Sequence, residues 1–254
     1  MDLPHARSAA ARLTVLPECG STNAELRMHE SDAVAWPHLS VLLTDSQTAG
    51  RGRLDRRWTT PPGAALAISV LLRELPGAVD ARGWIPLAAG VAMTDAVAAQ
   101  LPEHRVGLKW PNDVLVDGRK ICGILAEVAG ESIIVGTGVN TAMTADELPV
   151  PTATSFAALG VEVDVDRLLA DYLSRIDAIA RELIRTEDAV MSKLHEQVTA
   201  HCLTLGADVD VSLPDGSLLH GRARRLDADG RLIVDDGTQE RAVASGDVVH
   251  ARLA

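Results

Sequence analysis

The segment 47–58 reads Gln-Thr-Ala-Gly-Arg-Gly-Arg-Leu-Asp-Arg-Arg-Trp and places four arginines within seven residues. The glycines at 50 and 52 allow the backbone to approach a ligand closely, and guanidinium groups bind phosphate or carboxylate oxygens in pairs. Trp58 adds an apolar surface on which a base or ring can lie. The segment therefore predicts an anion-binding loop. A solvated surface charge cluster is an equally weighted alternative from these residues alone.

A second polar segment, 109–113, reads Lys-Trp-Pro-Asn-Asp and surrounds a proline that interrupts strand pairing and exposes its neighbours. Taken alone, it is typical of a strand that ends in an ordinary Asn-Asp turn. Further along the chain, Arg119 and Lys120 open an almost uncharged strand. Lys120 thus stands either at the mouth of a pocket or, as the commoner alternative, on a solvent-exposed hairpin.

The overall composition excludes several classes of protein. The 254 residues carry 24 Lys plus Arg against 35 Asp plus Glu, and the net charge of −11 repels nucleic acid. No segment has the roughly 20 apolar residues of a membrane span, and the N-terminus lacks the pattern of a secretory signal. Cys19, Cys122 and Cys202 are too few and too scattered for a disulfide framework or a metal-binding Cys-x-x-Cys pair. We expect a cytoplasmic protein that has reduced cysteines and binds neither nucleic acid nor a membrane.

Several common catalytic signatures are missing from the sequence. No phosphate-binding P-loop and no Gly-x-Ser-x-Gly elbow occur. The short run Gly136-Thr137-Gly138 lacks the third glycine of a dinucleotide-binding turn. His195-Glu196 is followed by Thr199, where a zinc-protease helix requires histidine. The mononucleotide-binding and hydrolase classes are therefore weakly supported.

The elements that must position these residues follow an α+β pattern. Thr22 and Glu25 have the spacing of a capping box and predict a short helix over 23–30. Apolar runs at 40–44 and 64–72 predict strands, and Pro86 suits the first turn of a helix that ends near Leu101. Segments 106–110, 114–116, 121–128 and 133–139 are separated by turn signals and predict a meander of hairpins. Apolar spacing from Asp166 predicts a long helix, and a second helix extends to 201, the pair covering one face of the sheet.

The pattern of apolar and polar residues changes after Gly206. Short alternating segments at 208–213, 219–226, 231–235 and 241–244 are punctuated by Asp-Gly turns. This pattern predicts a small β-barrel of about 50 residues. We therefore expect two domains, a catalytic or binding domain over 1–204 and a barrel over 205–254.

The order and spacing of the motifs resemble those of biotin protein ligases. The likeness covers about 14–140 and rests on Gly20-Ser21-Thr22-Asn23 and on segments 47–58, 107–113, 119–127 and 136–140. The terminal barrel resembles the SH3-like domain that ends such ligases. The resemblance implies a class II synthetase-like catalytic domain, with a mixed or antiparallel sheet flanked by helices. It also implies that biotin and Mg-ATP form biotinyl-5′-AMP, from which biotin passes to a lysine of an acceptor protein.

By this resemblance, each motif residue receives an expected role. Arg53 and Lys120 would be catalytic through fixed positive charge, and Asp113 would be the carboxylate near Mg²⁺ or the incoming lysine. The tail of biotin would lie among apolar strand residues. Biotin would be bound by Ser21, Thr22, Asn23, Gln47, Gly50, Arg51, Lys120 and Gly123, and ATP or the adenylate by Arg53, Arg56, Trp58, Asn112, Lys120 and Asn140.

The expected partner is the biotin carboxyl carrier domain of a biotin-dependent carboxylase. The resemblance begins so near the first residue that we expect no helix-turn-helix repressor domain, and a homodimer through the sheet is an open alternative. A lipoate ligase would share the fold and the adenylate chemistry. A non-enzymatic small-molecule sensor whose barrel binds a protein is the rival from another class.

Two residues depart from the family pattern or need a separate explanation. Asp55 stands where the family usually has glycine, so we expect it to pair with a neighbouring arginine and to compete modestly with ATP. Cys122 lies in a strand where small residues are usual, and we interpret it as a packing residue without a redox role.

Overall fold

A seven-stranded mixed sheet forms the centre of the larger part of the computed structural model, which describes residues 1–53, 56–213, 215–244 and 246–250. Its first strand pair is parallel and all other neighbours are antiparallel, as predicted for a mixed sheet. The last four strands of this sheet along the chain, which cover residues 106–140, form the predicted meander of hairpins. In spatial order the strands are β1 (Arg12–Val15), β2 (Ser40–Thr44), β5 (Ala65–Leu72), β9 (Ser132–Asn140), β8 (Arg119–Ala129), β7 (Asp113–Val116) and β6 (Val106–Lys109).

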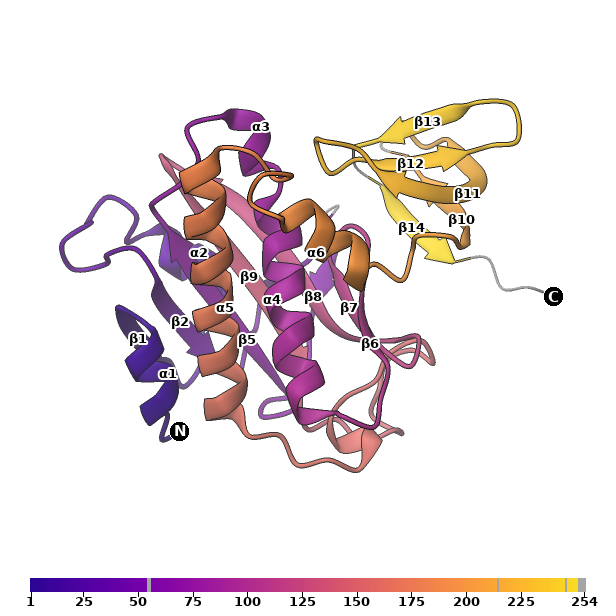
Figure 1. Cartoon of the computed structure of the whole chain (residues 1–254). Helices are drawn as coiled ribbons and strands as arrows, with labels where there is room; N and C mark the ends of the chain where they lie inside the picture. Colours follow the sequence, from indigo (N-terminus) through magenta and orange to yellow (C-terminus); the bar gives the residue numbers. More distant parts are fainter. Residues whose placement is uncertain (54–55, 214, 245, 251–254) are drawn as a thin grey trace.

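One face of this sheet is covered by helices (Figure 1). Because side chains alternate along a strand, Leu66, Ile68 and Val70 of β5 point into the main hydrophobic core. Helices α4 (Ile85–Gln100) and α5 (Val165–Thr186) lie side by side over that core. Helix α1 (Pro4–Ala9) packs against α5, and α6 (Leu194–His201) packs against α4 and β6. The two helices expected after Asp166 are α5 and α6. The layer over the core, however, is formed mainly by α4 and α5.

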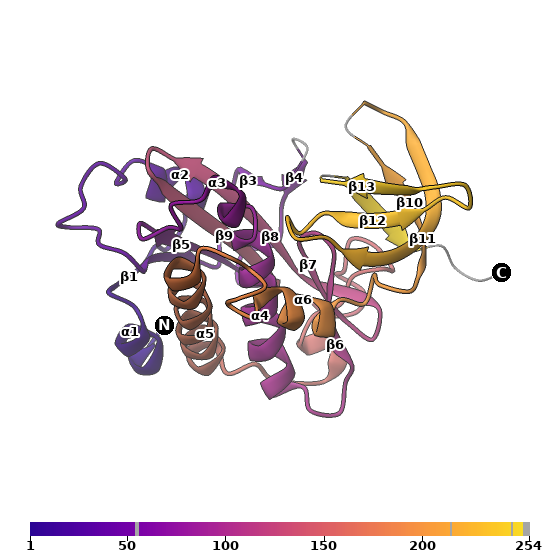
Figure 2. The ribbon, with the colours of Figure 1, turned by 45° about the horizontal axis from the view of Figure 1, so that its top comes forward.

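The opposite face carries the short helix α2 (Thr22–Arg27) and a small hairpin of β3 (Gly50–Arg51) and β4 (Arg57–Trp58) (Figure 2). The predicted capping box in α2 is wrong, because Ser21 is the N-cap residue and no side chain caps the helix. Thr22 lies inside the first turn, and its hydroxyl contacts another segment. The remaining short elements are α3 (Val79–Arg82) and a 3-10 turn at Ala157–Leu159.

The C-terminal part is a five-stranded antiparallel sheet of the SH3-like kind (Figure 1). Four of its strands match the predicted segments, and the fifth, β14, was not predicted. In spatial order they are β13 (Glu240–Val243), β12 (Leu232–Asp235), β11 (Leu218–Leu226), β10 (Asp208–Ser212) and β14 (Asp247–His250).

Two tryptophan side chains connect this small sheet to the larger part. The indole nitrogen of Trp84 donates to the carbonyl of Ala228, and that of Trp110 donates to the carbonyl of Gly230, both at 3.0 Å. Both tryptophans are almost completely buried. The turn between β11 and β12 is therefore fixed against α4 and against the segment that follows β6.

Within the described residues, no helix is long and apolar enough to cross a membrane.

Candidate active site

The floor of the candidate site is a row of residues with little or no side chain. Ala67 of β5, Gly138 of β9 and Gly123 of β8 are direct neighbours in the sheet register. Gly136 lies in the next row on the same face, between Ser69 and Leu125. The absence of side chains leaves a cavity of about 880 Å³ including its open mouth.

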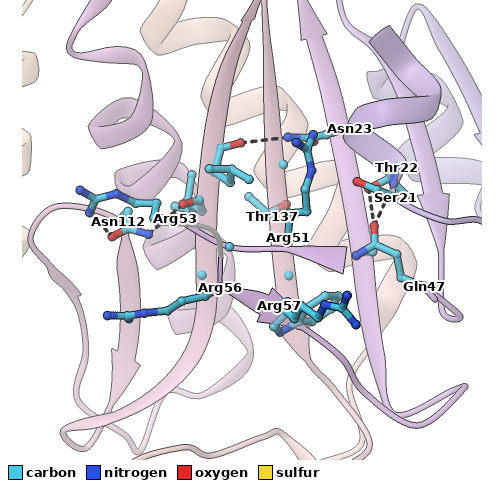
Figure 3. Close-up of a pocket in the computed structure, with 18 of the residues that line it drawn as sticks. Ser21, Thr22, Asn23, Gln47, Arg51, Arg53, Arg56, Arg57, Asn112 and Thr137 are labelled. Carbon is cyan, nitrogen blue, oxygen red and sulfur yellow. Dashed lines mark hydrogen bonds between the residues drawn. The ribbon is translucent and has the colours of Figure 1, made fainter. Parts of the chain in front are cut away.

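One wall of the cavity is a set of hydrogen-bonded polar side chains (Figure 3). Gln47 Oε1 accepts from the backbone N–H of Thr22 at 2.8 Å and from its hydroxyl at 3.1 Å. The hydroxyl of Ser69 lies 2.8 Å from the Thr22 hydroxyl and 2.6 Å from the side-chain amide oxygen Oδ1 of Asn23. The wall is thus preorganised by segments that are distant in sequence.

The glycine-rich segment folds over the floor as the hairpin β3–β4. Gly50 is required there, because a side-chain carbon would come within 2.3 Å of Gln47 Nε2 and of the Trp58 carbonyl. The indole of Trp58 lies against Gly138, whose added Cβ would be 2.8 Å from Trp58 Cζ2. Arg53 donates to Asn112 Oδ1 at 2.9 Å, and Asn112 in turn donates to the carbonyl of Ile124. The hairpin therefore closes one side of the cavity and carries its arginines inward.

The other end of the cavity is a cationic corner around one carboxylate. Lys120 Nζ lies 2.6 Å from Asp113 Oδ1, and Lys109 is the direct register partner of Asp113 in the β6–β7 hairpin. Burial lowers the pKa of Lys109 below its ordinary value; Asp113 opposes this shift, whereas Lys120 and Arg56 add to it. Burial likewise lowers the pKa of Arg53, although an arginine stays protonated in proteins. The positive charges in this corner outnumber the single negative charge of Asp113, and such a corner suits a polyphosphate.

Most of the residues expected from the sequence line this one cavity. Asn140 does not line it: its amide nitrogen donates to the carbonyl of Thr154 at 2.9 Å. Gly50, the first residue of β3, does not line it either and instead lines a second hollow beside the hairpin. Asp55, for which we expected a competing ion pair, lies outside the described residues. Those that do line the cavity are Ser21, Thr22, Asn23, Gln47, Arg51, Arg53, Arg56, Trp58, Asn112, Asp113, Lys120 and Gly123.

Several residues at the site were not selected from the sequence. Lys109 and Glu127 lie inside the motif segments, and their charge within nearly apolar strands was the available signal. Gly136 and Gly138 lie inside the motif segment 136–140, but they were given no role of their own. Ser69 had no signal, because a small polar residue in a buried strand usually serves packing. Cys122 belongs to the main core on the helical side, and burial raises the pKa of its thiol, as expected for a packing residue.

The described residues contain no group of three His, Cys, Asp or Glu side chains that could hold a metal ion. Asp113 is the carboxylate that lines the cavity, and it already contacts Lys120. Mg²⁺ is commonly bound by substrate phosphates, waters and one or two carboxylates. The site therefore fits a magnesium ion that arrives with bound phosphate groups, and among the described residues that line the cavity Asp113 is the one carboxylate that could be its ligand.

The fold and site define a member of the Biotin/lipoate A/B protein ligase family, which matches residues 20–140. Residues 204–251 match the biotin protein ligase C-terminal domain. A biotin–[acetyl-CoA-carboxylase] ligase of Mycobacterium tuberculosis is 40% identical over 250 residues, 97% of this chain and 92% of that protein. An enzyme of the same description from Paracoccus denitrificans is 31% identical, over 92% of this chain and 98% of that protein.

Solved structures agree with this relationship. A biotin protein ligase of Aquifex aeolicus, in complex with biotin and ATP, superposes with a TM-score of 0.78 at 26% identity, covering 96% of this chain and 100% of that chain. The chain belongs to the biotin protein ligase family.

Proposed function

We propose that this protein is an ATP-dependent biotin protein ligase that forms biotinyl-5′-AMP and transfers biotin to a lysine of a biotin carboxyl carrier domain. One observation carries the proposal: a single cavity joins a slot with a small-residue floor and a hydrogen-bonding wall to a cationic corner. The slot suits a compact polar ring with an apolar tail, and the corner suits a triphosphate. The names of the relatives from Mycobacterium tuberculosis and Paracoccus denitrificans support biotin as a substrate and a carboxylase as the acceptor, and the Aquifex aeolicus complex with biotin and ATP supports ATP.

In the first step, a carboxylate oxygen of biotin attacks the α-phosphorus of ATP, and the bond to the bridging oxygen breaks to release pyrophosphate. Negative charge accumulates on the phosphate oxygens in the transition state. Arg53, Arg56 and Lys120 place fixed positive charge at that end of the cavity. Such preorganised charges act strongly because they need no reorientation during the reaction.

In the second step, the amine of the acceptor lysine attacks the acyl carbon, an amide bond forms, and AMP leaves with the electron pair. The amine must be neutral to attack. Asp113 stands beside Lys120, and we propose that it either accepts this proton or, in the first step, would hold the magnesium ion that arrives with ATP and would neutralise phosphate charge. Closure of the hairpin would keep water away from the mixed anhydride between the two steps.

Other properties belong to the same proposal. Biotin contacts are assigned to the wall and to the backbone around Arg51, and Trp58 is assigned to the nucleotide. We divide the chain at residues 204 and 205, where the helices end and the second sheet follows. We further propose a cytoplasmic protein without affinity for nucleic acid, in keeping with its net charge of −11. A homodimer through the sheet stays an alternative for which sedimentation is the test.

The test is a pyrophosphate-release assay with purified protein, Mg-ATP, and either biotin or lipoate. We expect release that depends on biotin, a bound adenylate visible by mass spectrometry, and transfer to a carrier domain added afterwards. Release that depends on lipoate would instead assign the protein to lipoate ligases. No release with either acid would contradict the enzymatic proposal and favour a ligand sensor.

A further inference from the structure

Glu127 of β8 does not line the cavity itself but lines a neighbouring hollow that shares Arg51 and Leu125 with it, and it receives hydrogen bonds from two directions. Its Oε2 accepts from Asn23 Nδ2 at 2.7 Å, and its Oε1 accepts from Arg51 Nη2 at 3.1 Å. Arg27 is a more distant partner, at 3.7 Å from Oε1. The Glu127 side chain is only 19% exposed, so its charge depends on these donors more than on solvent.

These contacts extend the polar wall into a continuous chain of hydrogen bonds. The chain begins at Gln47, passes through the hydroxyls of Thr22 and Ser69, and reaches the amide of Asn23. Glu127 joins that amide to the guanidinium of Arg51. The order of the residues in this chain is Gln47, Thr22, Ser69, Asn23, Glu127 and Arg51.

Arg51 belongs to a hairpin that cannot hold itself in place. Strands β3 and β4 have two residues each and form a separate two-stranded sheet, joined to neither larger sheet by strand pairing. An isolated two-stranded hairpin is marginal in water, so its position depends on contacts with the rest of the protein. Backbone hydrogen bonds from Thr48 to Cys19 and from Ala49 to Gly20 fix the residues that lead into it, and side chains anchor the hairpin itself. Arg51 provides one anchor, on Glu127, and Arg53 provides another, on Asn112.

The chemistry of this anchor requires a carboxylate. Asn23 and Arg51 both donate, and two carboxylate oxygens accept both hydrogen bonds at once. A glutamine of the same shape would turn an NH₂ group toward one of the two donors. Charge-assisted bonds of this kind are also about twice as strong as neutral ones.

We propose that Glu127 is a positioning residue that couples the biotin-binding wall to the Arg-rich hairpin and holds the hairpin closed over the nucleotide. This inference rests on the proposed ligase function. Glu127 touches neither substrate in this role and acts through Arg51. Its loss should therefore weaken the use of ATP and the retention of the adenylate more than it weakens the binding of biotin.

The test compares Glu127→Gln with the wild type in biotin-dependent pyrophosphate release and in labelling of a bystander protein by escaped adenylate. We expect kcat/KM for ATP to fall by about tenfold or more, because one charge-assisted hydrogen bond is lost. We also expect bystander labelling to rise. The KM for biotin should change by less than about threefold. ATP kinetics and bystander labelling at the wild-type level would overturn the inference. A wild type without biotin-dependent release would instead contradict the proposed function.

Arg27→Met is the matched control, because it removes the distant partner of Glu127 and leaves the carboxylate with Asn23 and Arg51. We expect it to behave as the wild type. A double-mutant cycle with Arg51→Met tests the route of the effect. In the Arg51→Met background, Glu127→Gln should add little, and a full additional loss would overturn the coupling through Arg51.

Arg51→Met also serves if Glu127→Gln does not fold, since the Arg51 side chain is half exposed and should tolerate replacement. Raised bystander labelling by that variant is the expected result. Retention of the adenylate at the wild-type level would count against the anchor.

Discussion

At the scale of single residues, the site depends on where side chains are absent as much as on where they are present. The floor is open because Gly123 and Gly138 leave space beside Ala67. The charge that faces this space comes from a small number of cations, of which Lys120 is in direct contact with a carboxylate.

Lys120→Ala should abolish most adenylate formation, with a loss of about 100-fold or more, because a preorganised charge at the reacting phosphate is removed. The fold should survive, since the Lys120 side chain is 44% exposed and such ion pairs contribute only about 0–1 kcal/mol. Pyrophosphate release and thermal unfolding measure the two effects. Arg119→Ala is the control, because that neighbouring cation does not line the cavity. Near-normal release by the Lys120 variant would remove Lys120 from the mechanism.

Gly138→Ala should weaken the binding of biotin. The added Cβ would lie 2.8 Å from Trp58 Cζ2, so the indole must move and the floor becomes filled. Overpacking of this kind costs about 1–3 kcal/mol, roughly a 5- to 150-fold loss of affinity. Calorimetric titration with biotin measures it. Gly20→Ala is the control, because its Cβ would meet nothing within 4 Å. Equal affinity in both variants would contradict a floor that depends on Gly138.

At the scale of elements, three helices are held together by one polar cluster on the far side of the sheet. Asp95 of α4 accepts from Arg175 Nε of α5 at 2.8 Å, and its other oxygen lies 2.8 Å from His201 Nε2 of α6. Arg175 also donates to the side chain of Gln197 in α6. The cluster orders the helical layer that supports the strands of the site.

This cluster predicts a dependence of stability on pH. The hydrogen bond to Asp95 raises the pKa of His201 above its ordinary value of 6.5. A raised folded-state pKa contributes stability that is complete below about 6.5 and is lost as pH rises through the raised value. The contribution should stay below about 1 kcal/mol, because the pair is partly exposed.

Urea unfolding from pH 6 upward measures this effect. We expect the free energy of unfolding to decline with pH in the wild type and to decline less in His201→Gln. His220→Gln is the control, because the pair of His220 with Asp210 is exposed at the surface of the small sheet. Parallel curves for the wild type and His201→Gln would contradict the prediction.

At the scale of the whole molecule, the C-terminal sheet is fixed next to the site through the Lys-Trp-Pro-Asn-Asp segment. The side chain of Trp110 contacts the small sheet, and its backbone N–H donates to Thr204 Oγ1 at 3.0 Å. Two residues later, Asn112 holds Arg53. The same short segment therefore contacts both the C-terminal sheet and the cavity of the candidate site.

Trp110→Phe should lower the free energy of unfolding by about 1–3 kcal/mol, because it leaves the carbonyl of Gly230 without its indole donor. For a chain of this size, each kcal/mol lowers Tm by roughly 2–4 °C. Calorimetry measures the shift, and limited proteolysis at the junction of the two parts should become faster. An unchanged Tm together with an unchanged digestion rate would show that the indole contact does not hold the two parts together.

The sequence by itself determined the features that depend on near neighbours. The alternation and turn signals from 106 to 139 were sufficient for the meander, and the helical spacing after Asp166 was sufficient for α5. The cluster of arginines and Lys120 could be selected because their types and spacing already indicated an anion, and the motif resemblance then indicated biotin and ATP. A local prediction was wrong where a side chain had two possible roles. Thr22 was predicted to cap a helix, whereas its hydroxyl bonds to Gln47.

The tertiary structure alone decided the features whose partners are distant in sequence. Thr22 meets Gln47 across 25 residues, and Asn23 meets Glu127 across 104 residues. The open floor is a similar case, because Gly123 and Gly138 become neighbours only when β8 pairs with β9. Local patterns carry no information about such distances, since the register of a sheet is set by the packing of its whole buried face. For this reason the residues of the motifs could be named from the sequence, whereas the chain of hydrogen bonds that connects them required the fold.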